Sequence, residues 1–215
     1  MTLIDYLGLL PAFALVLSRL AGLTITAPLF SSQAIPMRLK AFFAAALTLS
    51  IFPAVAPATT FRLTLSDALV GMLGEFALGA VLGLGVALIL GAAQVAGLAV
   101  SQQAGLAIAQ VLDPMTGGGA SLLAEVYYVV AAMMFLALGG DRELVRALLD
   151  SFSAVPLMAF RPDVNAFGFL ADALSESFVL AVQLAAPAII ALLLTSVAIG
   201  FLARTVPQLN VISIG

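Results

Sequence analysis

Apolar residues form five long blocks along the chain, separated by shorter polar segments. The blocks cover residues 7–30, 41–58, 76–112, 126–138 and 177–203. An α-helix needs about 20 mainly apolar residues to cross the hydrocarbon core of a bilayer. The pattern therefore predicts an all-α fold of the polytopic membrane type, built from helical hairpins.

The third block carries no charged side chain and is too long for one upright crossing. It ends at Asp113-Pro114, which is followed by Met115-Thr116 and the glycine run Gly117-Gly118-Gly119. Irregular backbone at membrane depth is tolerated only where protein or trapped water satisfies it. The sequence thus predicts an embedded element that delivers a glycine-rich, plug-like loop into a protected cavity.

The remaining blocks predict one domain over residues 1–215 with three parts. Residues 1–140 hold the N-terminal hairpins and the central loop, residues 141–176 an amphipathic surface segment, and residues 177–215 the start of a C-terminal hairpin. Leu144, Ala147, Leu148 and Phe152 have helical spacing, which predicts the amphipathic helix. Pro187 lies inside the fifth block, where a kink is expected.

Small residues predict close helix contacts in two places. Gly79 and Gly83 are four residues apart, as are Ala93 and Gly97. Such spacing lets helix backbones approach each other in lipid. The sequence leaves open whether these positions contact another subunit or another helix of the same chain.

The few charges give a membrane orientation with weak support. Arg38 and Lys40 lie in a short connection without an acidic residue, which favours the cytoplasmic side. That choice places the N-terminus and residues 141–176 outside and Arg204 inside. Four basic residues would then lie on the outer side, against the usual charge bias.

Composition excludes several function classes. The chain is 63% hydrophobic and 9% charged, whereas soluble domains carry roughly 25% charged residues. There is no cysteine and no histidine, which excludes disulfides, thiolate metal sites and imidazole catalysis. The eight basic residues are scattered, so a nucleic-acid surface is not expected. No cofactor is predicted, and the first residues lack the positive segment of a signal peptide.

An intramembrane protease does not fit the sequence. Lys40 is the only lysine, and no serine motif stands out to pair with it. Gly139-Gly140-Asp141 approaches the motif of aspartyl proteases, but Leu138 occupies the position of its first glycine. Asp141 begins a charged segment and is better interpreted as a solvated helix start. The chain is therefore predicted not to be an enzyme.

An ion-coupled transporter remains the alternative from the residues alone. Arg19, Glu75 and Glu125 interrupt apolar blocks, and ionisable residues in membrane segments are functional candidates. The structural alternative is an internal ion pair or a head group that reaches the interface. Uncharged polar side chains favour an assembly interface or a lined passage over lipid exposure. These side chains are Gln94, Ser101, Gln102, Gln103, Gln110 and Gln183.

Three segments of the chain carry distinctive motifs. The first joins Leu17–Leu23, Ala27–Phe30 and Ile35–Arg38; the second joins Gln94–Gln103 to Val111–Pro114 and the glycine run. The third, Arg204-Thr205-Val206-Pro207-Gln208-Leu209-Asn210-Val211, is the most specific. Together these segments resemble the FliR family, the export-gate proteins of flagella and of injectisome type III secretion systems. Family members are typically longer and continue into a last hydrophobic helix. The second helix of the C-terminal hairpin, which would pair with residues 177–215, is therefore expected to be missing here.

The resemblance implies a non-catalytic gate subunit in the bacterial inner membrane, within the flagellar basal body. One copy would join two smaller membrane subunits in a hetero-oligomeric helical complex that passes unfolded exported chains. The central loop would plug the closed pore, and the late loop with Arg204, Gln208 and Asn210 would face a cytoplasmic switch protein. The residues of the plug would be Ile108, Val111, Leu112, Asp113, Pro114, Met115, Gly117, Gly118 and Gly119. Interface or pore-lining positions would be Gln94, Gln102, Gln103, Gln110 and Glu125.

The chemistry of the plug residues fits that role. Ile108, Val111, Leu112 and Met115 offer the apolar surface of a dewetting seal. Methionine adapts to different neighbours, and glycine allows large backbone changes when a loop moves. The expected seal blocks ions and yields to an unfolded chain.

Overall fold

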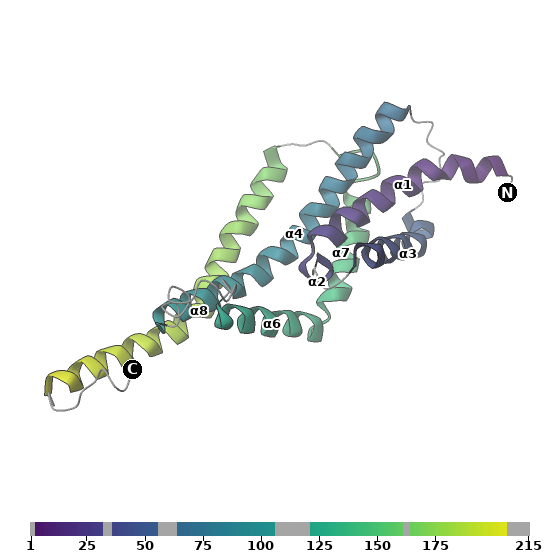
Figure 1. Ribbon diagram of the computed structural model, residues 1–215. Coiled ribbons are helices and arrows are strands. Elements are labelled where there is room, and N and C mark those ends of the chain that lie inside the picture. Colours follow the sequence, from purple (N-terminus) through teal and green to yellow (C-terminus); the bar gives the residue numbers. More distant parts are fainter. Residues whose placement is uncertain (1–2, 32–35, 56–63, 106–120, 161–163, 206–215) are drawn as a thin grey trace. The chain divides into compact units, whose positions relative to one another are not determined.

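The computed structural model describes residues 3–31, 36–55, 64–105, 121–160 and 164–205 (Figure 1). Within these residues every regular element is an α-helix. The helices are α1 (Leu3–Thr26), α2 (Pro28–Ser31), α3 (Met37–Val55), α4 (Leu65–Gln103), α6 (Leu122–Ala137), α7 (Gly140–Ala154) and α8 (Val164–Thr205). The all-α prediction is confirmed.

In the part of the chain that the structure describes, four helices are long and apolar enough to cross a membrane: α1, α3, α4 and α8. The count rises to five if α6 and α7, which are bent by 68° at their junction, form one broken span. At 1.5 Å per residue, the 39 residues of α4 extend about 58 Å. That is nearly twice the thickness of a hydrocarbon core, so α4 is too long for one upright crossing, as predicted.

Two helix boundaries differ from the apolar blocks. Helix α4 ends at Gln103, before the third block ends. Gly105 takes a left-handed conformation with φ 76°, and its N–H donates to the Gln102 carbonyl, which is a common way to end a helix. Helix α8 begins at Val164, well before the fifth block, and continues through Pro187 without ending.

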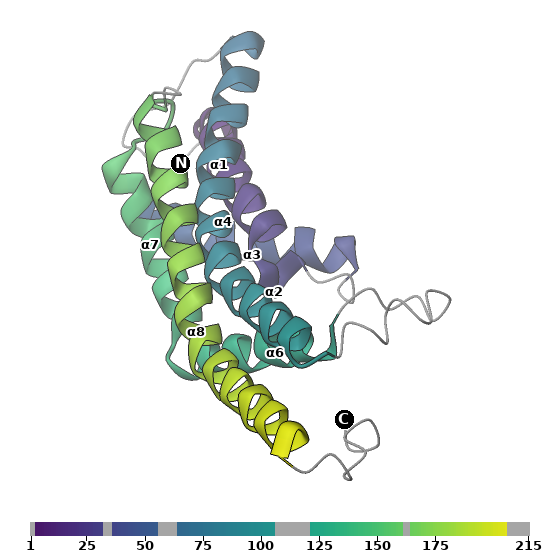
Figure 2. The same ribbon diagram turned by 90° about the vertical axis from the view of Figure 1, so that its left-hand side faces the viewer.

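The described residues group into two compact units, and α4, α6 and α8 each run from one into the other. Unit 1 comprises residues 1–90 and 132–175, and unit 2 comprises residues 91–131 and 176–215. In unit 1, α1 packs on α3 and lies beside the first half of α4 (Figure 2). Phe13 and Phe52 meet edge to face between α1 and α3, with ring centroids 5.6 Å apart.

The predicted amphipathic helix is α7, and its apolar face packs inside unit 1. Leu144, Leu148 and Phe152 are buried, whereas Ala147 is exposed. The helix ends at Ala154, two residues before Pro156. Gly139 precedes it with φ 79°, a conformation that glycine adopts without steric cost.

Lys40 of α3 and Arg142 of α7 line neighbouring pockets of unit 1. Lys40 lines one pocket and Arg142 lines another, and both pockets share Thr24, Phe30 and Phe43. The membrane orientation inferred from the charges of Lys40 and residues 141–176 stays a prediction.

Candidate functional site

Arg19 of α1 and Glu75 of α4 form a fully buried ion pair in unit 1. Arg19 Nε donates to Glu75 Oε2 at 2.6 Å, and Nη2 lies 2.5 Å from the same oxygen. Both residues have a relative exposure of 0%. The structural interpretation, an internal ion pair, is therefore confirmed for these two candidates.

The Arg19 guanidinium also contacts groups from α7 and from the segment after it. Arg19 Nη1 donates to Ser151 Oγ at 3.1 Å, and Nη2 donates to the Val155 carbonyl at 3.0 Å. The guanidinium lies 4.1 Å from the centre of the Phe152 ring, a distance at which the ring face attracts a cation. The Arg19 network is defined by these residues and one more: Arg19, Glu75, Ser151, Phe152, Val155 and Met158.

Met158 connects the network to the backbone after α7. Its N–H donates to Glu75 Oε1 at 3.0 Å, and its φ of 68° is left-handed. This conformation costs a residue with a side chain about 1–2 kcal/mol. Its sulfur occupies the space beside Gly71, where a Cβ would overlap the sulfur. The hydrogen bond and the close contact together hold the segment on α4.

Three glycines bring α1 and α4 into backbone contact. A Cβ on Gly22 would overlap the Phe76 carbonyl, one on Gly79 the Arg19 carbonyl, and one on Gly83 the Thr26 hydroxyl. Thr26 Oγ1 also lies 3.1 Å from the Ala80 carbonyl oxygen. The spacing of Gly79 and Gly83 therefore serves packing within the chain, which decides an alternative that the sequence left open.

In unit 2, the second half of α4 has two different faces. Gly97 packs on the α6 backbone, where a Cβ would lie 2.7 Å from the Ala124 Cα. Ala93 and Ser101 are buried. On the exposed side, Gln94, Leu98 and Gln102 follow one another at four-residue spacing, which places them in one stripe along the helix.

The predicted interface residues of unit 2 are thus surface residues. Gln94, Gln102, Gln103 and Glu125 are all exposed, and Gln110 lies outside the described residues. Glu125 stands in the first turn of α6, where a negative charge complements the helix dipole. Buried Ser121 precedes that turn, and its Oγ lies 3.5 Å from the Ala124 nitrogen.

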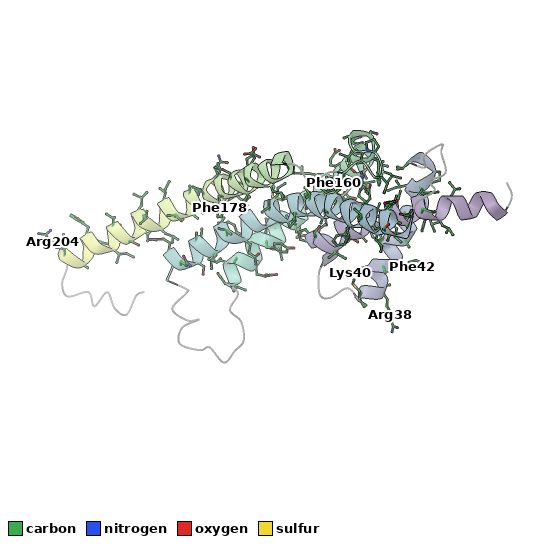
Figure 3. The ribbon with its side chains drawn as sticks, turned by 90° about the horizontal axis from the view of Figure 1, so that it is seen from above. Arg38, Lys40, Phe42, Phe160, Phe178 and Arg204 are labelled. Carbon is green, nitrogen blue, oxygen red and sulfur yellow. The ribbon has the colours of Figure 1, made fainter. Side chains whose placement is uncertain are left out.

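Helix α8 leaves most of its surface uncovered. Only 11% of its candidate membrane span is buried, and its buried residues in this structure are Ala181 and Ala185. A groove of about 330 Å³ runs between α4 and α8 in unit 2, lined by Val95, Ala99, Phe178, Val182 and Ile189 among others. Figure 3 shows Arg204 at the far end of α8, where it is exposed in the last turn.

Two sets of predicted site residues are not described by the structure. The plug residues Ile108 to Gly119 lie outside the described residues, as do Gln208 and Asn210 of the late loop. Within the described residues, no group of three or more acidic side chains is arranged to hold a metal ion.

Comparison with known proteins identifies the family. Residues 10–215 match the family described as "Bacterial export proteins, family 1". The chain belongs to this family. Similar proteins include the flagellar biosynthetic protein FliR of Bacillus subtilis, 31% identical over 97% of this chain and 82% of that protein. FliR of Escherichia coli is 31% identical over 93% and 76%, and the surface presentation of antigens protein SpaR of Shigella sonnei is 31% identical over 66% and 55%.

Membership in the export family decides between the two sequence-based functions. The protein is a bacterial export component of the flagellar and type III secretion class, and the ion-coupled transporter is not supported. The resemblance noted in the sequence is confirmed along nearly the whole chain.

The sequence named Arg19 and Glu75 without pairing them, and it did not predict the other partners in the Arg19 network. Ser151 and Phe152 lie on α7, and the Val155 carbonyl and the Met158 N–H belong to the backbone after it. One signal was available for the glycine contact, because Gly22 and Thr26 repeat on α1 the four-residue spacing of Gly79 and Gly83.

Proposed function

We infer that this protein is a non-catalytic subunit of the membrane export gate of a flagellar-type secretion system, where it contributes to the pore and to its closing plug. Its partners would be two smaller membrane subunits, a cytoplasmic switch protein and the unfolded chains that pass the gate. It would lie in the bacterial inner membrane at the flagellar basal body. Family membership over residues 10–215 supports the export role.

The observation that carries the gate proposal is the uncovered surface of α8. Large apolar side chains lie exposed around its second half: Ile190, Leu193, Leu194, Val197, Ile199, Phe201 and Leu202. A helix that is apolar on every side requires lipid or protein around it. The polar stripe of Gln94 and Gln102 on α4 favours protein, because amides in lipid need hydrogen-bonding partners.

The expected consequence is that the chain depends on its partners. Expressed singly, it should aggregate or be degraded, and co-expression with the two smaller gate subunits should restore it. A stable, soluble-in-detergent monomer that takes up ions in response to a small substrate would support a transporter and contradict the proposal. Abundance in purified membranes and co-purification measure the outcome.

The plug is tested by deleting Met115–Gly119 in an assembled gate. We expect the membrane to become leaky to ions, because the proposed seal is removed while the pore remains. Deletion of Pro57–Thr60, in the connection between α3 and α4, is a matched control and should leave conductance unchanged. Normal ion conductance in a Met115–Gly119 deletion with correct subunit composition would rule out the plug.

The late loop is tested by replacing Gln208 and Asn210 together with alanine. These polar residues follow Arg204 and are proposed to contact the switch protein on the cytoplasmic side. Export should fall while the subunit composition of the gate stays the same, and a crosslinker at position 208 should reach the switch protein. Normal export, or labelling of position 208 only from the outer side, would contradict this role.

A further inference from the structure

Two adjoining apolar pockets open between α1, α2, α3 and α7 of unit 1. The larger has a volume of about 580 Å³ and extends past Leu20 and Leu47 to Leu148. The smaller has a volume of about 430 Å³ and is lined by Leu39 and Phe42, among others. Both lie in the size range of pockets that hold small molecules, roughly 300–1,000 Å³.

A pair of stacked aromatic rings forms the wall between the pockets. Phe30 of α2 and Phe43 of α3 line both pockets, and their ring centroids are 4.9 Å apart at an interplanar angle of 28°. Thr24 also lines both, but its hydroxyl lies 3.1 Å from the Ala21 carbonyl oxygen of its own helix. The two pockets therefore make a forked apolar cavity with an aromatic divider.

Basic groups lie at the edges of this forked cavity. Lys40 lines the smaller pocket and Arg142 the larger one. Figure 3 shows Arg38, Lys40 and Phe42 together near the start of α3. Asp141 also lines the larger pocket, so one acidic group partly offsets the basic ones.

The start of α7 lies at the edge of the larger pocket, because Asp141 and Arg142 line it. Gly139, the residue before α7, provides no side-chain cap, and its carbonyl accepts the N–H groups of Arg142 and Glu143. Asp141 and Glu143 in this turn already complement the positive end of the helix dipole. Arg142 is therefore the group of α7 that attracts an anion at this edge.

We propose that this cavity binds an anionic phospholipid, with one acyl chain in each pocket and the phosphate near Lys40 and Arg142. The fork matches a lipid with two chains, and the aromatic divider separates them. Basic pockets between membrane helices are known to bind anionic head groups. The exposed Phe42 and Met37 at the start of α3 continue the apolar surface outward, so acyl chains can enter from a bilayer.

The test uses the assembled gate complex in a mild detergent and native mass spectrometry with added phosphatidylglycerol or phosphatidylcholine. We expect phosphatidylglycerol to remain bound preferentially. Lys40→Gln with Arg142→Gln should weaken its retention about tenfold or more, because each basic group near a lipid head group contributes substantially to binding. Arg146→Gln is the matched control, because Arg146 lies on the same helix, is exposed and pairs with Glu143.

A second variant tests the shape of the cavity independently of charge. Ala46 lines only the smaller of the two pockets, and Ala46→Trp should fill that arm and reduce phosphatidylglycerol retention with the basic residues intact. Co-purification of the other subunits shows that each variant still assembles.

Three results would overturn the proposal. The first is equal retention of phosphatidylglycerol and phosphatidylcholine, and the second is equal loss in the double variant and in Arg146→Gln. The third is a photo-crosslinker at Phe42 that forms adducts with a neighbouring protein and none with lipid, which would make the cavity a protein interface. None of these results bears on the export role, which the plug and co-expression experiments test separately.

Discussion

Different kinds of internal contact stabilise each of the two units of this protein. Unit 1 buries large side chains such as Leu15, Leu20 and Leu148, and it also buries the charges of Arg19 and Glu75. Among its described residues, unit 2 buries chiefly alanines, with Val100 as the largest of the buried side chains there, around the contact of α4 with α6 and α8. Its larger apolar residues lie on the outside of α8.

This difference indicates that unit 1 has its own specific core, whereas unit 2 depends on what surrounds it. A buried ion pair is costly unless its partners are all present, so the Arg19 network selects one arrangement of α1, α4 and α7. Small residues let helices approach closely but bury little apolar surface. We therefore expect substitutions in unit 1 to affect folding and substitutions on α8 to affect assembly.

The largest expected effect comes from removing one partner of the buried pair. Glu75→Ala leaves the Arg19 guanidinium buried without its carboxylate, which costs about 3–5 kcal/mol. The abundance and protease resistance of the protein in membranes should fall sharply. Glu143→Ala is the control, because the Glu143–Arg146 pair is exposed and such pairs contribute little. Equal behaviour of the two variants would mean that the network does not hold unit 1 together.

A double replacement separates loss of charge balance from loss of the whole network. Arg19→Met with Glu75→Leu removes both charges, and such replacements are often tolerated. We expect it to recover part of the stability lost in Glu75→Ala. Recovery should be incomplete, because the part-buried Val155 carbonyl and Met158 N–H lose their partners, and a fully buried group left unpaired costs about 1–3 kcal/mol. The thermal midpoint of the purified complex measures it.

The glycine contact should give an intermediate effect. Gly79→Ala places a methyl group against the Arg19 carbonyl, and overpacking of this kind costs about 1–3 kcal/mol. Gly85→Ala on the same helix meets no atom within 4 Å and should stabilise the helix by roughly 1 kcal/mol. Thermal midpoints that shift in the same direction for both variants would show that α1 and α4 are not in backbone contact.

The smallest effect on the chain itself is expected on α8. Leu194→Ser changes an exposed side chain, and surface substitutions usually shift stability by no more than about 0.5 kcal/mol. Its recovery in complex with the other gate subunits should nevertheless fall. Leu148→Ser in unit 1 is the contrasting variant, because it should lower the amount of the chain even before assembly.

The helices were predictable, because a long apolar segment can satisfy its backbone hydrogen bonds within itself only as a helix. Charge-free residues 76–112 predicted an overlong helix, and Gly79 with Gly83 predicted a close contact. Arg19 and Glu75 were identified as functional candidates because ionisable groups are rare in such segments, with an internal ion pair as one structural alternative.

Other features depend on tertiary structure and leave little trace in the sequence. The end of α4 at Gln103 depends on the conformation of Gly105 within an apolar run. Met158 and Val155 join the Arg19 network through backbone groups, which every residue type except proline possesses in full. The meeting of Lys40 and Arg142 at adjoining pockets depends on the packing of α3 and α7, which a charge bias does not encode.

A photo-crosslinking residue at position 194 in the assembled gate tests most directly whether protein covers the apolar surface of unit 2. We expect adducts between this position on α8 and other gate subunits, because neighbouring protein completes the exposed apolar surface of unit 2. Adducts with lipid alone, from a chain that is also stable when purified without partners, would show that unit 2 needs no protein partner.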